Sequence, residues 1–283
     1  MRQGLVLEGG AMRGMFTAGV LDVMMEHDVT YDGIVGVSAG AVFGCNYKSH
    51  QVGRVIRYNL RFCKEPRYCS FRSLIKTGDL FGAQFCYQEI PHVLDPFDVE
   101  TYQKTPMDFY VVATDVSTGK PVYHDCQIGE GPDLEWFRAS ASMPLAARMV
   151  EIEGARFLDG GIADSIPLKF AETKYERNVV VLTQPLGFRK ERNKMLPVLR
   201  KVYKDYPQLL ETMERRHENY NKSIAYLRGK ERRGELLVLR PEAPLDIDRV
   251  EHDPEKIIKT YQHGREVAEK NLPALLDYLK ASR

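Results

Sequence analysis

Hydrophobic and polar positions along the first part of the chain follow a pattern typical of alternating strands and helices. Short apolar runs predict buried strands at residues 3–8 and 33–37. Between them, residues 14–27 carry apolar side chains at positions i, i+4, i+7 and i+8, the spacing of one helix face, and a helix of small residues follows at 39–48. A strand–helix–strand–helix order predicts a parallel sheet with right-handed crossovers.

The middle of the chain continues this pattern, apart from one segment. Strands are predicted at residues 108–115, 122–124, 156–158 and 178–183, and a helix at 133–142 that ends before Pro144. Residues 51–105 carry many aromatic side chains and no clear period, so we expect helices and loops that cover one side of a site. Together these elements predict a three-layer α/β/α fold with a mainly parallel central sheet.

The composition changes near residue 185, which predicts a catalytic core at 1–185 and a charged, helical extension at 186–283. Within the extension, residues 186–233 are helix-prone, residues 236–239 read as a late strand, and residues 254–281 read as a closing helix. We expect the extension to pack on the core and to contribute the late strand.

Composition and charge exclude several classes of protein. A chain of 283 residues with 43% hydrophobic and 28% charged residues suits one large α/β domain, or one domain with an appendage. Its net charge of +1 gives no general attraction to nucleic acid or to an anionic membrane. Glu8 interrupts the first apolar run, so we expect neither a signal peptide nor a spanning helix, and the five cysteines without a CxxC pair suggest reduced thiols. These features predict a cytoplasmic protein.

The first of three glycine-rich segments is residues 9–14, Gly-Gly-Ala-Met-Arg-Gly. A tight turn at the start of a helix points free backbone N–H groups outward, where the helix dipole favours negative charge. The turn therefore suits a phosphate or an oxyanion, although it equally fits a strand–helix turn without a ligand. Met15 and Phe16 stand where a P-loop needs lysine and serine or threonine, and Ala11 breaks the dinucleotide-binding fingerprint.

The second segment, residues 36–40, is a G-x-S-x-G motif between a predicted strand and a predicted helix. This is the setting of a nucleophile elbow, in which a sharp turn lifts the hydroxyl of Ser38 out of the sheet. Glycines two positions to either side let neighbouring chain pass without a clash with Cβ. The third segment, Asp-Gly-Gly at residues 159–161, is by itself an ordinary turn.

The order of these segments is itself informative. A glycine-rich turn that ends in Arg-Gly is followed by G-x-S-x-G after a short gap, and by a distant Asp-Gly-Gly. Ala-Thr-Asp and Thr-Gly at residues 113–119, and Arg-Ala-Ser-Ala-Ser-Met-Pro at residues 138–144, lie between them. This arrangement, over roughly residues 4–183, resembles the bacterial type of the patatin-like phospholipase family.

The resemblance implies a serine lipid acyl hydrolase of the phospholipase A or esterase type, with Ser38 as nucleophile and Asp159 as base. It also implies an oxyanion hole formed by the backbone N–H groups of Gly9, Gly10 and Ala11. The positions that support these motifs are Arg13, Gly14, Gly36, Gly40, Gly160 and Gly161. A serine helped by a carboxylate attacks an ester and forms an acyl-enzyme that water hydrolyses, so we expect no metal and no cofactor.

Two positions depart from the family pattern. Ala11 stands where the family usually has a third glycine, and an alanine there can still donate its N–H if φ is negative. Ser165 stands where the family often has asparagine downstream of the aspartate, and its hydroxyl can hydrogen-bond a loop.

Two other functions fit parts of the pattern. A Ser-His-Asp esterase of the α/β-hydrolase type would use Ser38, Asp159 and then His217, His252 or His263, but only one strand precedes the Ser38 strand. A non-catalytic acyl-chain or nucleotide-binding module would use the same clefts, although a binder has no use for a strained serine. A covalent serine probe separates this module from an enzyme.

A basic stretch follows the predicted core. It comprises Arg189, Lys190, Arg192, Lys194, Arg200, Lys201 and Lys204. This stretch suits contact with anionic lipid head groups at a membrane surface, or else forms a solvated helix face, because Glu191 and Asp205 are interleaved. We therefore expect a lipid or acyl-ester substrate and no nucleic-acid partner. No HExxH motif and no Cys or His cluster has the spacing of metal ligands.

Overall fold

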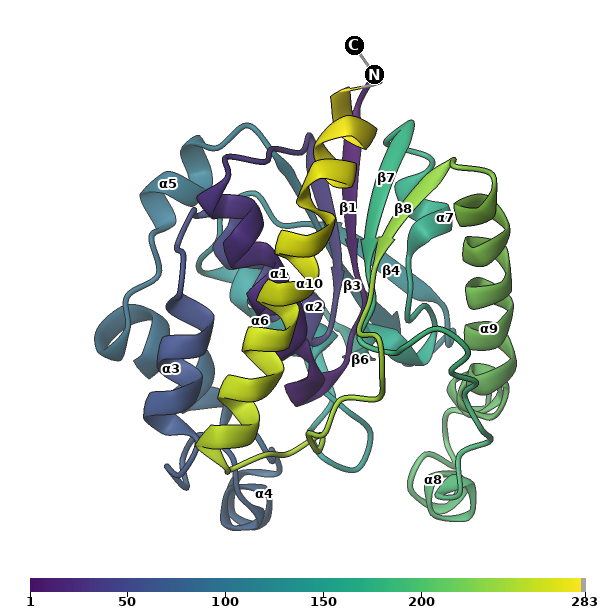
Figure 1. Ribbon diagram of the computed structural model, residues 1–283. Helices are drawn as coiled ribbons and strands as arrows, with labels where there is room; N and C mark the ends of the chain where they lie inside the picture. Colours follow the sequence, from purple (N-terminus) through teal and green to yellow (C-terminus); the bar gives the residue numbers. More distant parts are fainter. Residues whose placement is uncertain (281–283) are drawn as a thin grey trace.

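The computed structural model describes residues 1–280, and an eight-stranded sheet with helices on both faces forms its centre (Figure 1). The strands are β1 (Gln3–Leu7), β2 (Gly33–Val37), β3 (Asp108–Asp115), β4 (Pro121–Asp125), β5 (Val150–Ile152), β6 (Ala155–Asp159), β7 (Arg177–Val181) and β8 (Leu236–Leu239). Their order is β5-β6-β3-β2-β1-β7-β8, and β4 pairs with β3. Strands β1, β2, β3, β7 and β8 are parallel, whereas β4 and β6 run antiparallel to β3.

The helices form the two outer layers. They are α1 (Gly14–Glu26), α2 (Ala39–Lys48), α3 (Arg54–Phe62), α4 (Phe71–Thr77), α5 (Val99–Lys104), α6 (Pro132–Ser140), α7 (Leu168–Ala171), α8 (Leu196–Val202), α9 (Pro207–Arg232) and α10 (Pro254–Lys280). Two 3-10 helices, η1 (Ala11–Arg13) and η3 (Gly160–Ile162), and a π-helix, η2 (Phe85–Leu94), complete them. Together with the sheet these layers confirm the predicted α/β/α fold.

Side chains of successive strand residues point to opposite faces of the sheet, and this alternation creates two cores. On β1, Leu5 and Leu7 are buried in the core beneath α1 and α10, whereas Val6 belongs to the core on the side of α7 and α9. Helices α1 and α10 lie very close together, because a Cβ on Gly19 would come within 2.1 Å of the carbonyl oxygen of Tyr261. The last helix therefore packs directly on the first.

Most predicted elements are present, with small shifts at their ends. The segment 51–105 consists of helices and loops, as expected. Strand β5 was missed because its three residues are too few to show an alternating pattern. The predicted helix at 254–281 is α10, and residue 281 lies outside the described residues. The boundary at residue 185 stays a prediction, although β8 extends the sheet beside β7.

Strand register brings the ends of β2 and β6 to the same place. Val37, the last residue of β2, pairs with Val112 of β3, and Asp159, the last residue of β6, pairs with Ala113 on the other edge of β3. Ser38, which follows β2, and Asp159, which ends β6, thus lie on either side of β3 near its end.

Candidate active site

Ser38 occupies the sharp turn between β2 and α2. Its backbone has φ 54° and ψ −123°, a strained conformation for a residue with a side chain, and its side chain is almost buried. The backbone at the end of β1 passes very close to this turn, since a Cβ on Gly40 would lie 2.5 Å from the carbonyl oxygen of Leu7. Only glycine fits there, which accounts physically for one glycine of the G-x-S-x-G motif.

Asp159 faces Ser38 across the end of β3. The Ser38 hydroxyl donates a hydrogen bond of 2.7 Å to Oδ2 of Asp159, and both side chains are buried. The other carboxylate oxygen, Oδ1, accepts a hydrogen bond of 2.7 Å from the backbone N–H of Gly161. Both oxygens of Asp159 are therefore oriented, and one is directed at the serine.

Two further side chains fix this pair, and both lie in segments that the sequence pattern had singled out. Ser140, at the end of α6, accepts a hydrogen bond of 2.8 Å from the backbone N–H of Ser38 and donates one of 2.6 Å to the carbonyl oxygen of Val112. Thr114 of β3 donates a hydrogen bond of 2.8 Å to the carbonyl oxygen of Asp159. Ser140 belongs to the Arg-Ala-Ser-Ala-Ser-Met-Pro segment and Thr114 to Ala-Thr-Asp, although nothing in the sequence distinguished the role of Thr114.

Arg216 of α9 was not anticipated as part of the site. Its Nε donates a hydrogen bond of 2.5 Å to the carbonyl oxygen of Gly161, which also accepts one of 2.7 Å from the hydroxyl of Ser165. Burial raises the pKa of Asp159, and the positive charge of Arg216 opposes this effect most strongly. Arg216 and Ser165 thus hold the loop that orients the carboxylate, and Arg216 also favours its charged form.

The glycine-rich turn passes directly beside Ser38. A Cβ on Gly9 would lie 2.9 Å from Cβ of Ser38, so a larger residue cannot occupy this position without displacing the serine. Among residues 1–280, none accepts a hydrogen bond from the backbone N–H groups of Gly9, Gly10 or Ala11. Ala11 has φ 49°, so the negative φ considered for it is wrong, and its backbone adopts the left-handed region that favours glycine.

Glu8 supports the same turn from beneath and was also missed. Its carboxylate accepts hydrogen bonds of 2.6 Å from the backbone N–H of Thr183 and 2.7 Å from the hydroxyl of Tyr220. Burial raises its pKa, and these two donors oppose the shift. Glu8 therefore connects the end of β1 to β7 and to α9, which places the turn relative to the C-terminal part of the chain.

The histidines of the rival triad lie elsewhere. Nδ1 of His217 is 3.0 Å from the carbonyl oxygen of Glu214, and Nδ1 of His252 is 2.6 Å from that of Cys63. His263 lies against Phe16. Within the described part of the chain, Asp159 is the side chain that contacts the Ser38 hydroxyl, and no histidine does.

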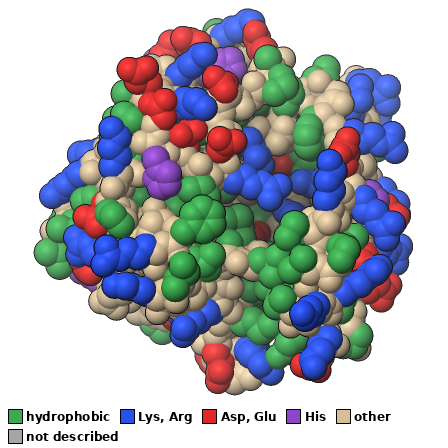
Figure 2. Space-filling view, turned by 90° about the horizontal axis from the view of Figure 1, so that it is seen from below, with side chains coloured by type: hydrophobic (Ala, Val, Ile, Leu, Met, Phe, Trp, Pro, Cys, Tyr) green, Lys and Arg blue, Asp and Glu red, His purple; other side chains and the backbone are tan. Residues whose placement is uncertain are grey.

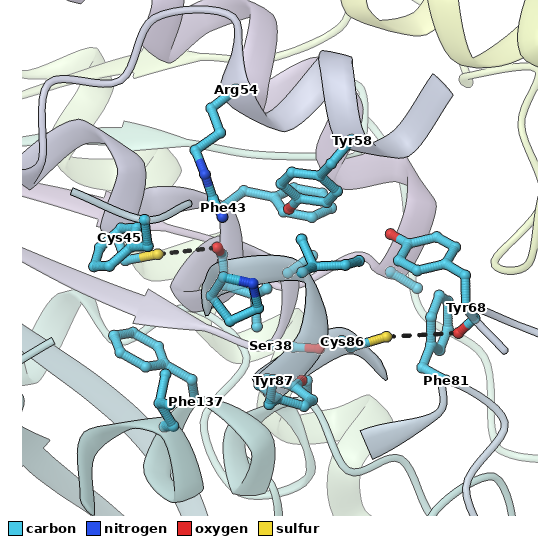
Figure 3. A pocket seen from close by; sticks show the side chains of 18 of the residues that line it. Ser38, Phe43, Cys45, Arg54, Tyr58, Tyr68, Phe81, Cys86, Tyr87 and Phe137 are labelled. Atoms are coloured by element: carbon cyan, nitrogen blue, oxygen red, sulfur yellow. Dashed lines mark hydrogen bonds between the residues drawn. The ribbon is translucent and has the colours of Figure 1, made fainter. Parts of the chain in front are cut away.

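A deep pocket opens in front of Ser38 (Figure 3), with about 1020 Å³ of empty space counted out to its mouth. Figure 3 shows aromatic side chains around it, from α2, from the 51–105 segment and from α6. They include Phe43, Tyr58, Tyr68, Phe81, Tyr87 and Phe137. The expectation that residues 51–105 cover one side of the site agrees with this lining. The pocket is predominantly apolar, as in sites that bind hydrocarbon.

One cluster of side chains has the chemistry of metal ligands. Donor atoms of His124, Cys126 and Asp133 lie within 4.8 Å of one another. Asp133 comes from the start of α6, so the sequence spacing did not reveal the cluster. One of its oxygens already accepts hydrogen bonds from the backbone N–H groups of Ile128 and Gly129, and none of the three residues lines the pocket.

Comparison with known proteins matches both parts of the chain. An uncharacterized Escherichia coli protein, YjjU, is 30% identical over 186 residues, which are 64% of this chain and 51% of YjjU. Lysophospholipase NTE1 of Chaetomium globosum is 26% identical over 170 residues, 58% of this chain and 10% of that protein. The chain thus spans about half the length of YjjU and a small part of the lysophospholipase.

Among solved structures, VipD of Legionella pneumophila aligns with 96% of this chain and 67% of its own, with a TM-score of 0.47 and 11% identity. A domain of unknown function, DUF6363, matches residues 206–280. The patatin-like phospholipase model matches residues 5–172, which include Ser38 and Asp159. The chain therefore belongs to the patatin-like phospholipase family.

Proposed function

We propose that the protein is a serine lipid acyl hydrolase of the phospholipase A or esterase type. It cleaves carboxylic esters through a dyad of Ser38 and Asp159 and an acyl-enzyme. The observation that carries this proposal is the 2.7 Å hydrogen bond between the two buried side chains, of which Ser38 lines an apolar pocket. Membership of a phospholipase family supports lipid esters as the substrate class.

The proposed reaction has two steps. Asp159 takes the proton of the Ser38 hydroxyl as Oγ bonds to the ester carbonyl carbon, and the N–H groups of Gly9 and Gly10 receive the oxyanion. The tetrahedral intermediate expels the alcohol, which takes the proton from Asp159. Water then attacks the acyl-enzyme and gives a proton to Asp159, the fatty acid is released, and Oγ of Ser38 takes the proton back from Asp159.

The pocket in front of Ser38 would hold the acyl chain. Its lining is hydrocarbon and aromatic for most of its depth, and burial of each CH₂ group contributes about 0.8 kcal/mol. The one arginine that lines it, Arg54, is already paired with Asp95 at 3.3 Å and donates a hydrogen bond to Asn46. Asp95 also pairs with Arg57 at 2.8 Å, and its carbonyl oxygen accepts a hydrogen bond of 2.6 Å from Arg54, so the guanidinium of Arg54 is held by polar partners.

We also propose that the protein meets a lipid surface with the end of the molecule to which the parallel strands run. Figure 1 shows α4 and α8 at this end, on opposite sides. Phe71 and Ile75 of α4 are 79% and 85% exposed, and Val198 and Val202 of α8 are exposed too. Basic residues flank both groups, for example Arg72. No helix among residues 1–280 is long and apolar enough to cross a bilayer.

The test of the dyad compares three variants on a soluble acyl ester. Ser38→Ala and Asp159→Asn should each lower kcat about 10²–10⁴-fold, the usual contribution of a positioned base. Their combination should be little worse than either alone, because members of one catalytic unit are not additive. A fluorophosphonate should label Ser38, as seen by mass spectrometry of the tryptic peptide.

The matched controls are His217→Ala and His252→Ala, which should keep most activity. A folded Asp159→Asn with near-normal turnover, beside an inactive histidine variant, would replace the dyad by a triad. Absence of both labelling and turnover in the wild type would favour the binding module instead.

A further inference from the structure

Four positively charged side chains gather beside the dyad, and none of them lines the apolar pocket. They are Arg13 of η1, Lys190 after β7, Arg216 of α9 and Arg249 before α10. We propose that they form a subsite for the phosphate of an anionic lipid head group, which rests on the proposed hydrolase function and narrows its substrate class. The acyl chain and the phosphate of such a substrate would lie on opposite sides of Ser38.

Direct contacts place each of these residues near the site. Arg216 donates to the carbonyl oxygen of Gly161, two residues from Asp159. The carbonyl oxygen of Arg249 accepts a hydrogen bond of 3.4 Å from the N–H of Met12, which lies in the glycine-rich turn. Lys190 Nζ lies 4.3 Å from the ring centre of Tyr220, whose hydroxyl donates to Glu8.

The four charges are uncompensated at short range. Within the described residues, none of them has a carboxylate oxygen within the 4.0 Å of an ion pair, and Nε of Arg13 is buried without any hydrogen-bond partner. Glu8, an acid near the cluster, already accepts hydrogen bonds from Thr183 and Tyr220. Asp159 and Glu8 are the acids that act on the cluster, and four positive charges beside two negative ones favour binding of an anion.

The charges also lie within electrostatic reach of one another. Burial, and after it the charge of Arg216, lower the pKa of Lys190 to about 8; Glu8 opposes this shift, and Arg13 and Arg249 contribute to it. Burial also lowers the pKa of Arg216; Asp159 opposes this shift, and Arg249 contributes to it. A bound dianion would remove this mutual repulsion, and arginine matches the oxygens of a phosphate in a bidentate manner.

The surface of this end of the molecule agrees with two opposed binding regions. Figure 2 shows a central hollow with hydrophobic side chains around much of its rim and a group of Lys and Arg side chains at one side. None of the four basic residues lines the apolar pocket. Lys190, Arg216 and Arg249 lie beyond residue 172, where the phospholipase family match ends, so the C-terminal part of the chain would select the head group.

The experiment measures binding to full-length Ser38→Ala, which cannot turn the ligand over. Isothermal titration at low ionic strength compares a short-chain monoacylglycerol phosphate, the matching neutral monoacylglycerol, and inorganic phosphate. The phosphate-bearing ester should bind at least tenfold more tightly than the neutral one. Adding Lys190→Gln and Arg249→Gln together should remove this preference, since each cation near a phosphate is worth about tenfold or more.

The matched control removes two neighbouring exposed charges, Arg189→Gln and Lys222→Gln, and should keep the preference. Equal affinity for the two esters, or an equal loss in the control, would overturn the subsite. Inorganic phosphate bound as tightly as the ester would also overturn it, because the site would then hold a free ion. The subsite and the hydrolase function can also fail separately. If Ser38→Ala still binds the phosphate-bearing ester more tightly and the wild type hydrolyses neither ester, the proposed hydrolase function is refuted and the subsite is supported.

Discussion

Arg216 should set the pH at which the enzyme gains activity, because its charge opposes the effect of burial on Asp159. The base must be deprotonated to accept the serine proton, so kcat/KM rises with pH through the pKa of Asp159 in the free enzyme. Burial raises this pKa above the usual value of an aspartate, and Arg216 lowers it again. Arg216→Gln should therefore raise the pKa and move the acid limb of the profile to higher pH.

The size of this shift follows from the geometry around Gly161. A Cβ on this residue would lie 3.0 Å from Oδ1 of Asp159 and 3.2 Å from Nη2 of Arg216, so the two atoms are no more than 6.2 Å apart, the sum of these distances. Unit charges about 6 Å apart interact by about 3 kcal/mol at an effective dielectric constant near 20. Arg216 is half-buried and partly screened, so we expect it to stabilise the ionised carboxylate by about 1–3 kcal/mol, enough to move the acid limb measurably.

The assay is kcat/KM for a neutral, soluble acyl ester, measured from about pH 4, the usual pKa of an aspartate, up to about pH 8, because burial raises the pKa of Asp159. A neutral ester separates this effect from head-group binding. Arg216→Lys is the control, because it keeps the charge and loses the planar hydrogen-bonding group. This variant should keep the acid limb close to that of the wild type, even where kcat falls through poorer positioning of Gly161.

Two results would refute the reasoning. An acid limb that stays in place in Arg216→Gln would show that the arginine charge does not act on the catalytic base. Equal shifts in Arg216→Gln and Arg216→Lys would show that the side chain acts by positioning alone.

Three further predictions concern other parts of the molecule. Ala11→Gly should raise the free energy of unfolding by about 1 kcal/mol, because it relieves a left-handed backbone, and an unchanged urea midpoint would show that no strain is stored there. The KM for a phosphate-bearing ester should rise above about pH 8, where Lys190 loses its proton, and this rise should vanish in Lys190→Gln; a neutral ester that shows the same rise would contradict the assignment. Phe71→Asp combined with Ile75→Asp should lower the ratio of vesicle to soluble-ester hydrolysis about tenfold or more, and an unchanged ratio would remove α4 from the membrane contact.

Local signals in the sequence predicted the fold and singled out Ser38 as the candidate nucleophile. The apolar runs of β1 and β2 and the glycines around Ser38 report on short-range geometry, and steric contact at Gly40 allows no other residue. Asp159 was identified by resemblance, because an Asp-Gly-Gly turn alone carries no such information. The register of β2 and β6 on β3 then brings Asp159 to Ser38.

Contacts between segments that are far apart in the sequence could not be predicted from local patterns. Arg216 lies in a charged helix whose sequence is typical of a solvated face, and only the packing of α9 brings its Nε to Gly161. The backbone of Ala11 is another case, since the residue type favours a negative φ and the surrounding turn imposes a positive one. The partners of Glu8 likewise come from β7 and α9, far along the chain.

The place of β1 within the sheet has a consequence for how the chain acquires its structure during synthesis. One neighbour, β2, follows soon after, but the other is β7, where Gln3 pairs with Arg177. Until β7 has left the ribosome, β1 keeps an unpaired hydrophobic edge, and such edges promote aggregation. Contacts this remote in sequence also slow folding, because the long intervening loop must close before they form. If the full-length protein misfolds during expression, slower synthesis or a lower temperature should increase its soluble yield. Fragments that stop before β7 should be insoluble.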